Sequence, residues 1–238
     1  MKRFGLSRVF AQRRVFMRGY ALRSLFGVLI AALAIAFASS DGAAQARVSI
    51  GVTETIETHN PYGDSVSLLY GIWSEITGPF CTYNYAKGDF EGRLAERWKV
   101  ENPTTWIFYL SKEYKFHDGS PVTADDVVHS IMNRVIKDPQ SKQKASVAGP
   151  IVKAEAIDQH TVRVTTDKPA APLLSFVCDR LIVTSKAVYD KHGRDAADRQ
   201  HMMGGGPYRL KELVPGQRLV IAKRPDHPMA KKNPRAPD

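Results

Sequence analysis

The sequence predicts a mixed α/β fold with two sheets, in a chain of 238 residues. Two observations lead to this prediction. Alternating apolar runs come in pairs around short turns rich in Asn, Asp, Pro and Gly, which is typical of β-hairpins. Segments with apolar residues at helical spacing lie between these pairs, so that strands and helices are interspersed along the chain.

The first 46 residues have the composition of an export signal. They hold seven Lys or Arg and one acidic residue, and an apolar run from Leu25 to Ala38 follows the basic part. Because a spanning helix needs about 20 apolar residues, the pattern favours a cleaved signal peptide over a membrane anchor. Cleavage is expected after Ala46. Arg13 and Arg14 resemble a twin-arginine export motif, and the general secretory route stays open as the alternative.

Charge and cysteine content limit the function classes. The formal charge of +10 falls to +4 without the leader, which contains seven of the 34 basic and one of the 24 acidic residues. The remaining basic residues are dispersed, which argues against nucleic-acid binding. The first cysteine, Cys81, is far from the cleavage site, so we expect a free periplasmic protein without a lipid anchor. Cys81 and Cys178 could pair or stay buried thiols, and the sequence leaves both open.

The mature chain begins with a predicted strand at 48–52, followed by a polar loop at 58–65. Helical apolar spacing from Leu68 to Ile76 predicts a helix that a Gly-Pro pair ends. Weak signals between 80 and 92 predict a turn between short strands. A hairpin follows, whose second strand, Thr105 to Leu110, is strongly β-forming.

The stretch from Tyr114 to Arg134 has the clearest local pattern. His-Asp-Gly-Ser-Pro at 117–121 has the composition of a tight turn. Thr123 can then cap a helix that begins at Ala124, with Asp126 three residues on to complete the cap. Apolar residues recur along one face of that helix, so this face is expected to lie in the core.

The rest of the chain is predicted to hold two more hairpins and two short helices. The segment 138–149 is polar and expected to be mobile, and a brief strand is expected at 181–183. The glycines at 204–206 lack the Lys-Ser/Thr of a phosphate-binding loop and lead into a strand, so we expect a flexible crossover. The predicted elements are strands 151–157 with 161–166, strands 208–213 with 218–223, and helices 169–177 and 185–192.

Four blocks in order resemble the family 5 extracellular solute-binding proteins of ABC importers, the dipeptide, oligopeptide and nickel receptors. The blocks are Glu96–Val100, Thr105–Phe108, Phe116–Val128 and Gly206–Tyr208. The resemblance implies a periplasmic-binding-protein-like α/β fold of class II, in which two lobes close on a ligand and deliver it to a permease. It also implies a transport function without catalysis and without a cofactor.

The resemblance implies a domain organisation as well. Family members are about twice this length, so the chain is expected to be an incomplete fragment that holds most of the first lobe and lacks the second. The expected parts are a signal peptide at 1–46, lobe I at 47–73 and 182–238, and an inserted subdomain at 74–181.

The candidate ligand-binding residues are Tyr62, Gly63, Asp64 and Ser65, in the loop after the first strand. The matching segment lines the cleft in the family, while an ordinary polar loop is the alternative reading. The expected ligand is a peptide or similar small solute, and the expected partner is an ABC transporter permease in the inner membrane.

A secreted metal-dependent enzyme is the alternative function. It would use His117, Asp118, Asp125 and His129, of which the last two are four residues apart on one helix. A turn, a cap and a solvated helix face explain the same residues, and their spacing matches no known metal signature. A third alternative is an interaction module that docks through surface exposed where the second lobe is missing.

Overall fold

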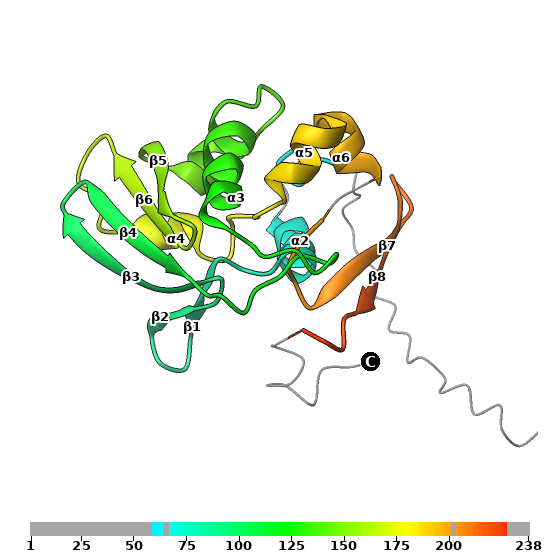
Figure 1. Ribbon diagram of the computed structural model, residues 1–238, viewed down its shortest axis with the longest axis horizontal. Helices are drawn as coiled ribbons and strands as arrows, with labels where there is room; N and C mark the ends of the chain where they lie inside the picture. Colours follow the sequence, from blue (N-terminus) through cyan, green and yellow to red (C-terminus); the bar gives the residue numbers. More distant parts are fainter. Residues whose placement is uncertain (1–58, 64–66, 201–202, 228–238) are drawn as a thin grey trace, which may run out of the picture. The chain divides into compact units, whose positions relative to one another are not determined.

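The computed structural model describes residues 59–63, 67–200 and 203–227 (Figure 1). The predicted signal peptide, its cleavage site after Ala46 and the strand at 48–52 lie outside these residues. The described part is mixed α/β, as predicted, but its strands form three sheets instead of two. One sheet has four strands, and two are two-stranded hairpins.

The elements follow one another in an interspersed order. The helices are α2 (Ser67–Thr77), α3 (Ala124–His129), α4 (Leu173–Val177), α5 (Lys186–His192) and α6 (Arg194–Gln200), with π-helical segments η1 (Ser130–Ile136) and η2 (Lys144–Ala148). The strands are β1 (Cys81–Asn84), β2 (Asp89–Gly92), β3 (Ala95–Asn102), β4 (Thr105–Leu110), β5 (Ile151–Asp158), β6 (Thr161–Thr166), β7 (Tyr208–Val214) and β8 (Arg218–Lys223).

The four-stranded sheet has the antiparallel order β3-β4-β6-β5 and confirms two predicted hairpins. β4 is an interior strand with neighbours at both edges, and residues on both of its faces are buried. Trp106 and Phe108 are buried and belong to the hydrophobic core. Figure 1 shows α3 beside this sheet. On the other face Ile107 pairs with Lys99 and Arg163, whose long aliphatic stems can cover it. β7 and β8 confirm the last predicted hairpin.

The capped helix begins at Ala124, as the sequence predicts. In the turn before it, Asp118 Oδ1 accepts a hydrogen bond of 2.9 Å from the Ser120 N–H. The N–H and hydroxyl of Thr123 both lie 2.8 Å from Asp126 Oδ2, which completes the capping box. The other carboxylate oxygen of Asp126 accepts the N–H of Lys186, at 2.8 Å. One side chain therefore holds the beginnings of both α3 and α5.

Three local predictions were wrong in part. The segment 138–149 contains η2, whose residues Val147 and Ala148 are buried, so it is anchored by packing. The expected strand at 181–183 is reduced to a single bridge between Ile182 and Pro79. The helix predicted to begin near Pro169 begins only at Leu173.

The three glycines at 204–206 pack against the end of α2, whereas the sequence suggested a flexible crossover. The N–H groups of Gly205 and Gly206 donate to the carbonyls of Thr77 and Ile76, at 3.0 and 2.9 Å. A Cβ atom on Gly204 would lie 2.3 Å from the Ile76 carbonyl oxygen. These glycines are needed because two backbones touch there, and we call this contact the glycine seam.

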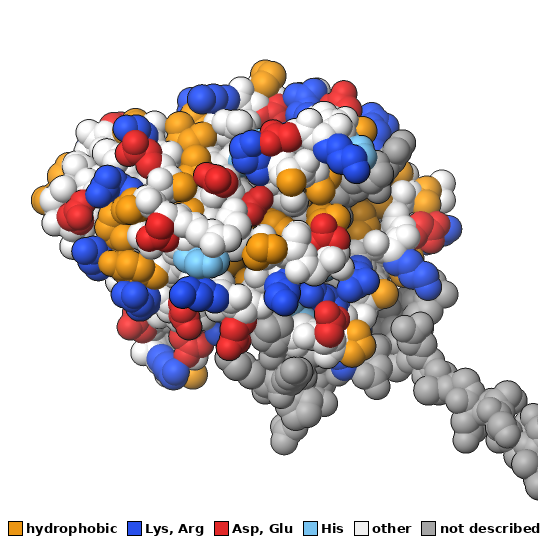
Figure 2. Space-filling model, viewed as in Figure 1, with side chains coloured by type: hydrophobic (Ala, Val, Ile, Leu, Met, Phe, Trp, Pro, Cys, Tyr) orange, Lys and Arg blue, Asp and Glu red, His pale blue; other side chains and the backbone are white. Residues whose placement is uncertain are grey.

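The surface of the described residues is mixed in charge. On the face shown in Figure 2, Lys and Arg side chains alternate with Asp and Glu side chains over the whole described area. Among the residues that the structure describes, no helix is both long and apolar enough to cross a membrane.

Candidate ligand-binding region

The predicted ligand loop is held firmly at its start. Gly63 N–H donates to the Asn60 carbonyl at 2.9 Å, and Tyr62 N–H donates to Asn60 Oδ1 at 3.0 Å, which closes a turn. The Tyr62 side chain is fully buried. Its hydroxyl donates to the carbonyl of Ile182 and accepts the N–H of the same residue, both at 2.7 Å. Burial raises the pKa of the Tyr62 phenol, so the hydroxyl keeps its proton.

A buried ionic cluster fixes the other side of this loop. The Arg134 guanidinium donates to Asn60 Oδ1 at 3.1 Å, to Asp138 Oδ2 at 2.7 Å, and to both oxygens of Asp198 at 2.9 and 2.8 Å. Its centre lies 4.6 Å from the ring centroid of Tyr189, whose hydroxyl donates to Asp198. We call these five residues the Arg134 cluster.

The Arg134 cluster is nearly closed to water, since the side chain of Arg134 is 3% exposed and that of Asp138 is 2% exposed. Arg194, at the rim, adds a second ion pair to Asp138 at 3.0 Å. Two arginines thus neutralise two aspartates, and this pairing is what makes their burial tolerable. The cluster joins the Asn60 loop, η1 and α6, three segments far apart in the sequence.

A shallow pocket of about 270 Å³ lies beside the cluster, between η1 and the helices α5 and α6. His129 lines it and packs on Tyr189, with ring centroids 5.3 Å apart. Burial and the nearby Arg134 lower the pKa of His129, which favours the neutral imidazole. The charged groups that line this pocket form ion pairs within the protein, Arg134 and Arg194 with Asp138, and Asp190 with Lys186.

The four predicted ligand residues are placed as follows. Tyr62 and Gly63 are buried, and Asp64 and Ser65 lie outside the described residues. The Lys142 N–H donates to the Tyr62 carbonyl at 3.0 Å, so the segment before η2 lies against the loop. The contact of these four residues with a ligand stays a prediction, and the Tyr62 side chain has an anchoring role in addition.

The residues of the metal-enzyme alternative have separate structural roles. Asp118 closes the turn, Asp125 is exposed in the first turn of α3, and His129 packs on an aromatic ring. The His117 N–H donates to the Gly204 carbonyl at 3.0 Å, at the glycine seam. No group of three or more metal-ligating side chains is found in the described ranges, so the alternative gains no support there.

The sequence analysis missed the Arg134 cluster. It did not predict α6, the helix that supplies Asp198, although Gly193 followed by an acidic residue in the next turn is a helix-start signal. Asn60 was read only as a loop residue. The pairing of Arg134 with a residue 64 positions later leaves no local pattern to find.

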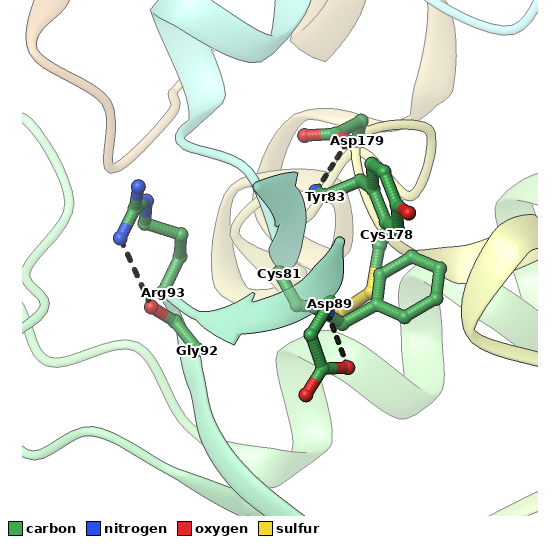
Figure 3. Close-up of a disulfide and its surroundings, with 8 residues drawn as sticks. Cys81, Tyr83, Asp89, Gly92, Arg93, Cys178 and Asp179 are labelled. Atoms are coloured by element: carbon green, nitrogen blue, oxygen red, sulfur yellow. Dashed lines mark hydrogen bonds between the residues drawn. A yellow bond between two sulfur atoms is a disulfide. The ribbon is translucent and has the colours of Figure 1, made fainter. Parts of the chain in front are cut away.

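Cys81 and Cys178, left open by the sequence, form a disulfide with a Cα–Cα distance of 4.4 Å. Figure 3 shows it at the base of the β1–β2 hairpin, next to Asp179. The carboxylate of Asp179 accepts the Tyr83 N–H at 3.1 Å, and its own N–H donates to the Cys81 carbonyl at 2.8 Å. The hairpin is therefore tied to the end of α4 by covalent and hydrogen bonds together.

Comparison with known proteins places these features in a family. Residues 89–236, more than half of the chain, match the model of the bacterial extracellular solute-binding proteins, family 5 Middle. The chain is 37% identical over 150 residues to the probable D,D-dipeptide-binding periplasmic protein DdpA of Escherichia coli K12, covering 61% of this chain and 28% of DdpA. It is 30% identical over 151 residues to the periplasmic oligopeptide-binding protein OppA of the same organism, covering 56% and 28%.

Two solved structures share the fold. OppA of Burkholderia pseudomallei has a TM-score of 0.63 and 26% identity over 76% of this chain and 38% of that one. The binding protein MoaA of A. tumefaciens R10, in complex with mannopinic acid, has a TM-score of 0.63 and 26% identity over 74% and 36%. The chain therefore spans less than half the length of these relatives.

These matches confirm the predicted fold class, a mixed α/β part of a class II periplasmic binding protein. The family model covers the capped helix, the four-stranded sheet and the β7–β8 hairpin. The chain belongs to the family 5 bacterial extracellular solute-binding proteins.

Proposed function

We propose that this chain contributes part of the periplasmic substrate-binding component of an ABC importer, without enzymatic activity, and that its ligand is a peptide or a similar small solute. Family membership carries the proposal. The relatives named for D,D-dipeptide and oligopeptide binding favour a peptide, while the complex of MoaA with mannopinic acid widens the class to other small solutes. An inner-membrane permease is the proposed partner, and the periplasm the proposed location.

Within this function, we propose that Tyr62 to Ser65 form one wall of the ligand site. The described start of the loop supports this, because Asn60 and Tyr62 are fixed to the Arg134 cluster and to Ile182. A loop whose start is fixed in this way loses less conformational entropy when a ligand binds. The buried side chain of Tyr62 supports the loop, and Asp64 and Ser65 are the proposed contacts.

The test uses the chain from residue 47 and a chimera in which residues 59–227 replace the structurally equivalent segment of OppA of Burkholderia pseudomallei. Isothermal titration with a mixed di- to pentapeptide library measures binding to both. We expect the chimera to bind peptides and the chain alone to bind at least about 100-fold more weakly, since it supplies only part of the enclosing surface. A chimera that melts cooperatively but binds no peptide or other small solute overturns the proposed function.

Two variants of the chimera test the loop. Asp64→Ala is expected to weaken peptide binding by roughly tenfold with an unchanged melting temperature, because it removes a contact and no support. Tyr62→Phe is expected to lower the melting temperature, because the two polar backbone groups of Ile182 lose their partner. If Asp64→Ala leaves affinity unchanged, the loop is an ordinary polar loop.

A further inference from the structure

The first and last parts of the predicted inserted subdomain, 74–181, lie side by side near its boundary. We call the two segments Pro79–Cys81 and Cys178–Ile182 the neck. Pro79 and Ile182 form an isolated antiparallel bridge, and the disulfide joins the two segments a few residues further in. Figure 3 shows the disulfide between the first strand of the hairpin and the segment that carries Asp179.

Apart from the disulfide, the neck is held by non-covalent contacts. Ala95 N–H donates to the Phe80 carbonyl at 2.7 Å, and Phe80 and Ile182 are buried. β1 and β2 are four residues each, and a two-stranded sheet of this size is marginal on its own. Asp179 has a φ of 61°, a left-handed backbone conformation that side chains other than glycine rarely adopt. Strain of this kind persists only where the surroundings enforce it. Here the surroundings are the adjacent disulfide and the two hydrogen bonds that Asp179 makes to the backbone of Tyr83 and Cys81.

The disulfide also closes a long loop and is shielded. It joins residues 97 positions apart, so it removes much of the freedom that the unfolded chain would otherwise have. Cys81 is 0% exposed and Cys178 is 4% exposed. A dithiol reductant must reach a sulfur atom to attack it, so this burial should slow reduction of the folded protein.

We propose that the Cys81–Cys178 disulfide is a redox-dependent clasp, which closes the neck after export to an oxidising compartment and leaves it loose in a chain that stays reduced. In the closing step one cysteine thiolate attacks a disulfide-bearing oxidant and releases one thiol. The second thiolate then attacks the mixed disulfide and releases the other thiol. The two cysteines lose two protons and two electrons, and the oxidant's disulfide becomes two thiols.

Formation of the disulfide would also stabilise the anchor of the candidate ligand loop. Ile182, which lies in the neck, holds both the Pro79 bridge and the two hydrogen bonds to the Tyr62 hydroxyl. A loose neck therefore loosens the anchor of the loop. The proposal does not depend on the proposed transport function, because it is tested by stability and local opening without any ligand.

The experiment compares the chain from residue 47 in oxidised form, the same chain kept reduced with dithiothreitol after refolding, and the double variant Cys81→Ser with Cys178→Ser. We expect the last two to melt about 10 °C or more below the oxidised protein, as removal of a long-loop disulfide predicts. Amide hydrogen exchange should be at least about tenfold faster at residues 79–84 and 179–182, with little change in β4 and β6.

The reduced wild-type chain distinguishes the effect of the disulfide bond from the effect of replacing two buried cysteines with serine. If it melts within 2 °C of the oxidised form while the double variant is less stable, the loss comes from the serine hydroxyls and the proposal is overturned. Native-state reduction within minutes, with no change in exchange at the neck, overturns it as well. If the double variant fails to fold, the exchange and melting of the reduced wild type still decide the outcome.

Discussion

The Arg134 cluster and the glycine seam each hold distant segments of the chain together, by opposite means. In the cluster, one guanidinium from η1 meets a loop amide and two carboxylates, and all of these groups are buried. In the seam, the backbone of residues 204–206 touches the backbone at the end of α2, with no side chain between them.

Because the two contacts are built differently, different substitutions should disrupt them. The cluster depends on charge balance, so it fails when one partner is removed and an unpaired charge stays buried. The seam depends on the absence of a side chain, so it fails when one carbon atom is added. We therefore expect the cluster to respond mainly to the loss of a single charge, and the seam to the addition of a side chain at Gly204.

The largest expected effect is at Arg134. Arg134→Met removes the positive charge and leaves Asp138 and Asp198 buried without their main partner. We expect a loss of about 3–5 kcal/mol in the free energy of unfolding, measured by urea denaturation. The matched control is Arg163→Met, whose ion pair with Glu101 is 3.8 Å long and about 40% exposed, so the expected loss is below about 1 kcal/mol.

Adding Asp198→Asn to Arg134→Met sharpens the test. If charge balance is what the cluster needs, the double variant regains part of the lost stability, because one unpaired buried charge is gone. A double variant less stable than Arg134→Met would show that shape and hydrogen bonding, instead of charge balance, determine how much the cluster stabilises the protein.

The second effect is at the glycine seam. Gly204→Ala places a Cβ 2.3 Å from the Ile76 carbonyl oxygen and 2.6 Å from the Thr77 Cα, so the two backbones must separate. We expect a loss of about 1–3 kcal/mol. Gly71→Ala is the control: it lies in α2 with nothing within 4 Å, and it should stabilise the protein by about 0.5–1 kcal/mol. Equal effects of the two substitutions would contradict the close contact.

The smallest expected effect is a pH dependence beside the seam. Burial, and then the nearby Arg224, lower the pKa of His227 from 6.5 to about 4, and the same two causes lower the pKa of His117 to about 4. The unfolded chain therefore binds protons at a higher pH than the folded one. The contribution of the two uncharged histidines to the stability of the folded state is fully present above about pH 6.5. It is lost as the pH falls towards 4.

Urea denaturation at pH 7 and pH 4.5 checks this expectation. His227→Gln should reduce the loss of stability between the two values by about 1–2 kcal/mol, because one of the two imidazoles with a lowered pKa is removed. His160→Gln, at the turn between β5 and β6, serves as the control. An unchanged pH dependence in His227→Gln would place the acid sensitivity elsewhere.

Part of the candidate region could be predicted and part could not. The loop at 62–65 was found from its composition and from the family resemblance, and its anchor at Asn60 is an ordinary turn. The burial of Tyr62 was not foreseen, because its partner Ile182 lies 120 positions away. The glycines at 204–206 were recognised as unusual, but their composition alone does not distinguish flexibility from a close backbone contact.

The sequence by itself determined the capped helix α3 and the three predicted hairpins, because caps, turns and alternation act between residues only a few positions apart. It also carried the resemblance that the family match confirmed. Only the tertiary structure decided which charges meet at Arg134, whether Cys81 and Cys178 pair, and why position 204 is glycine. These contacts join residues about 60 to 130 positions apart, and their pairing depends on how the finished elements pack against one another.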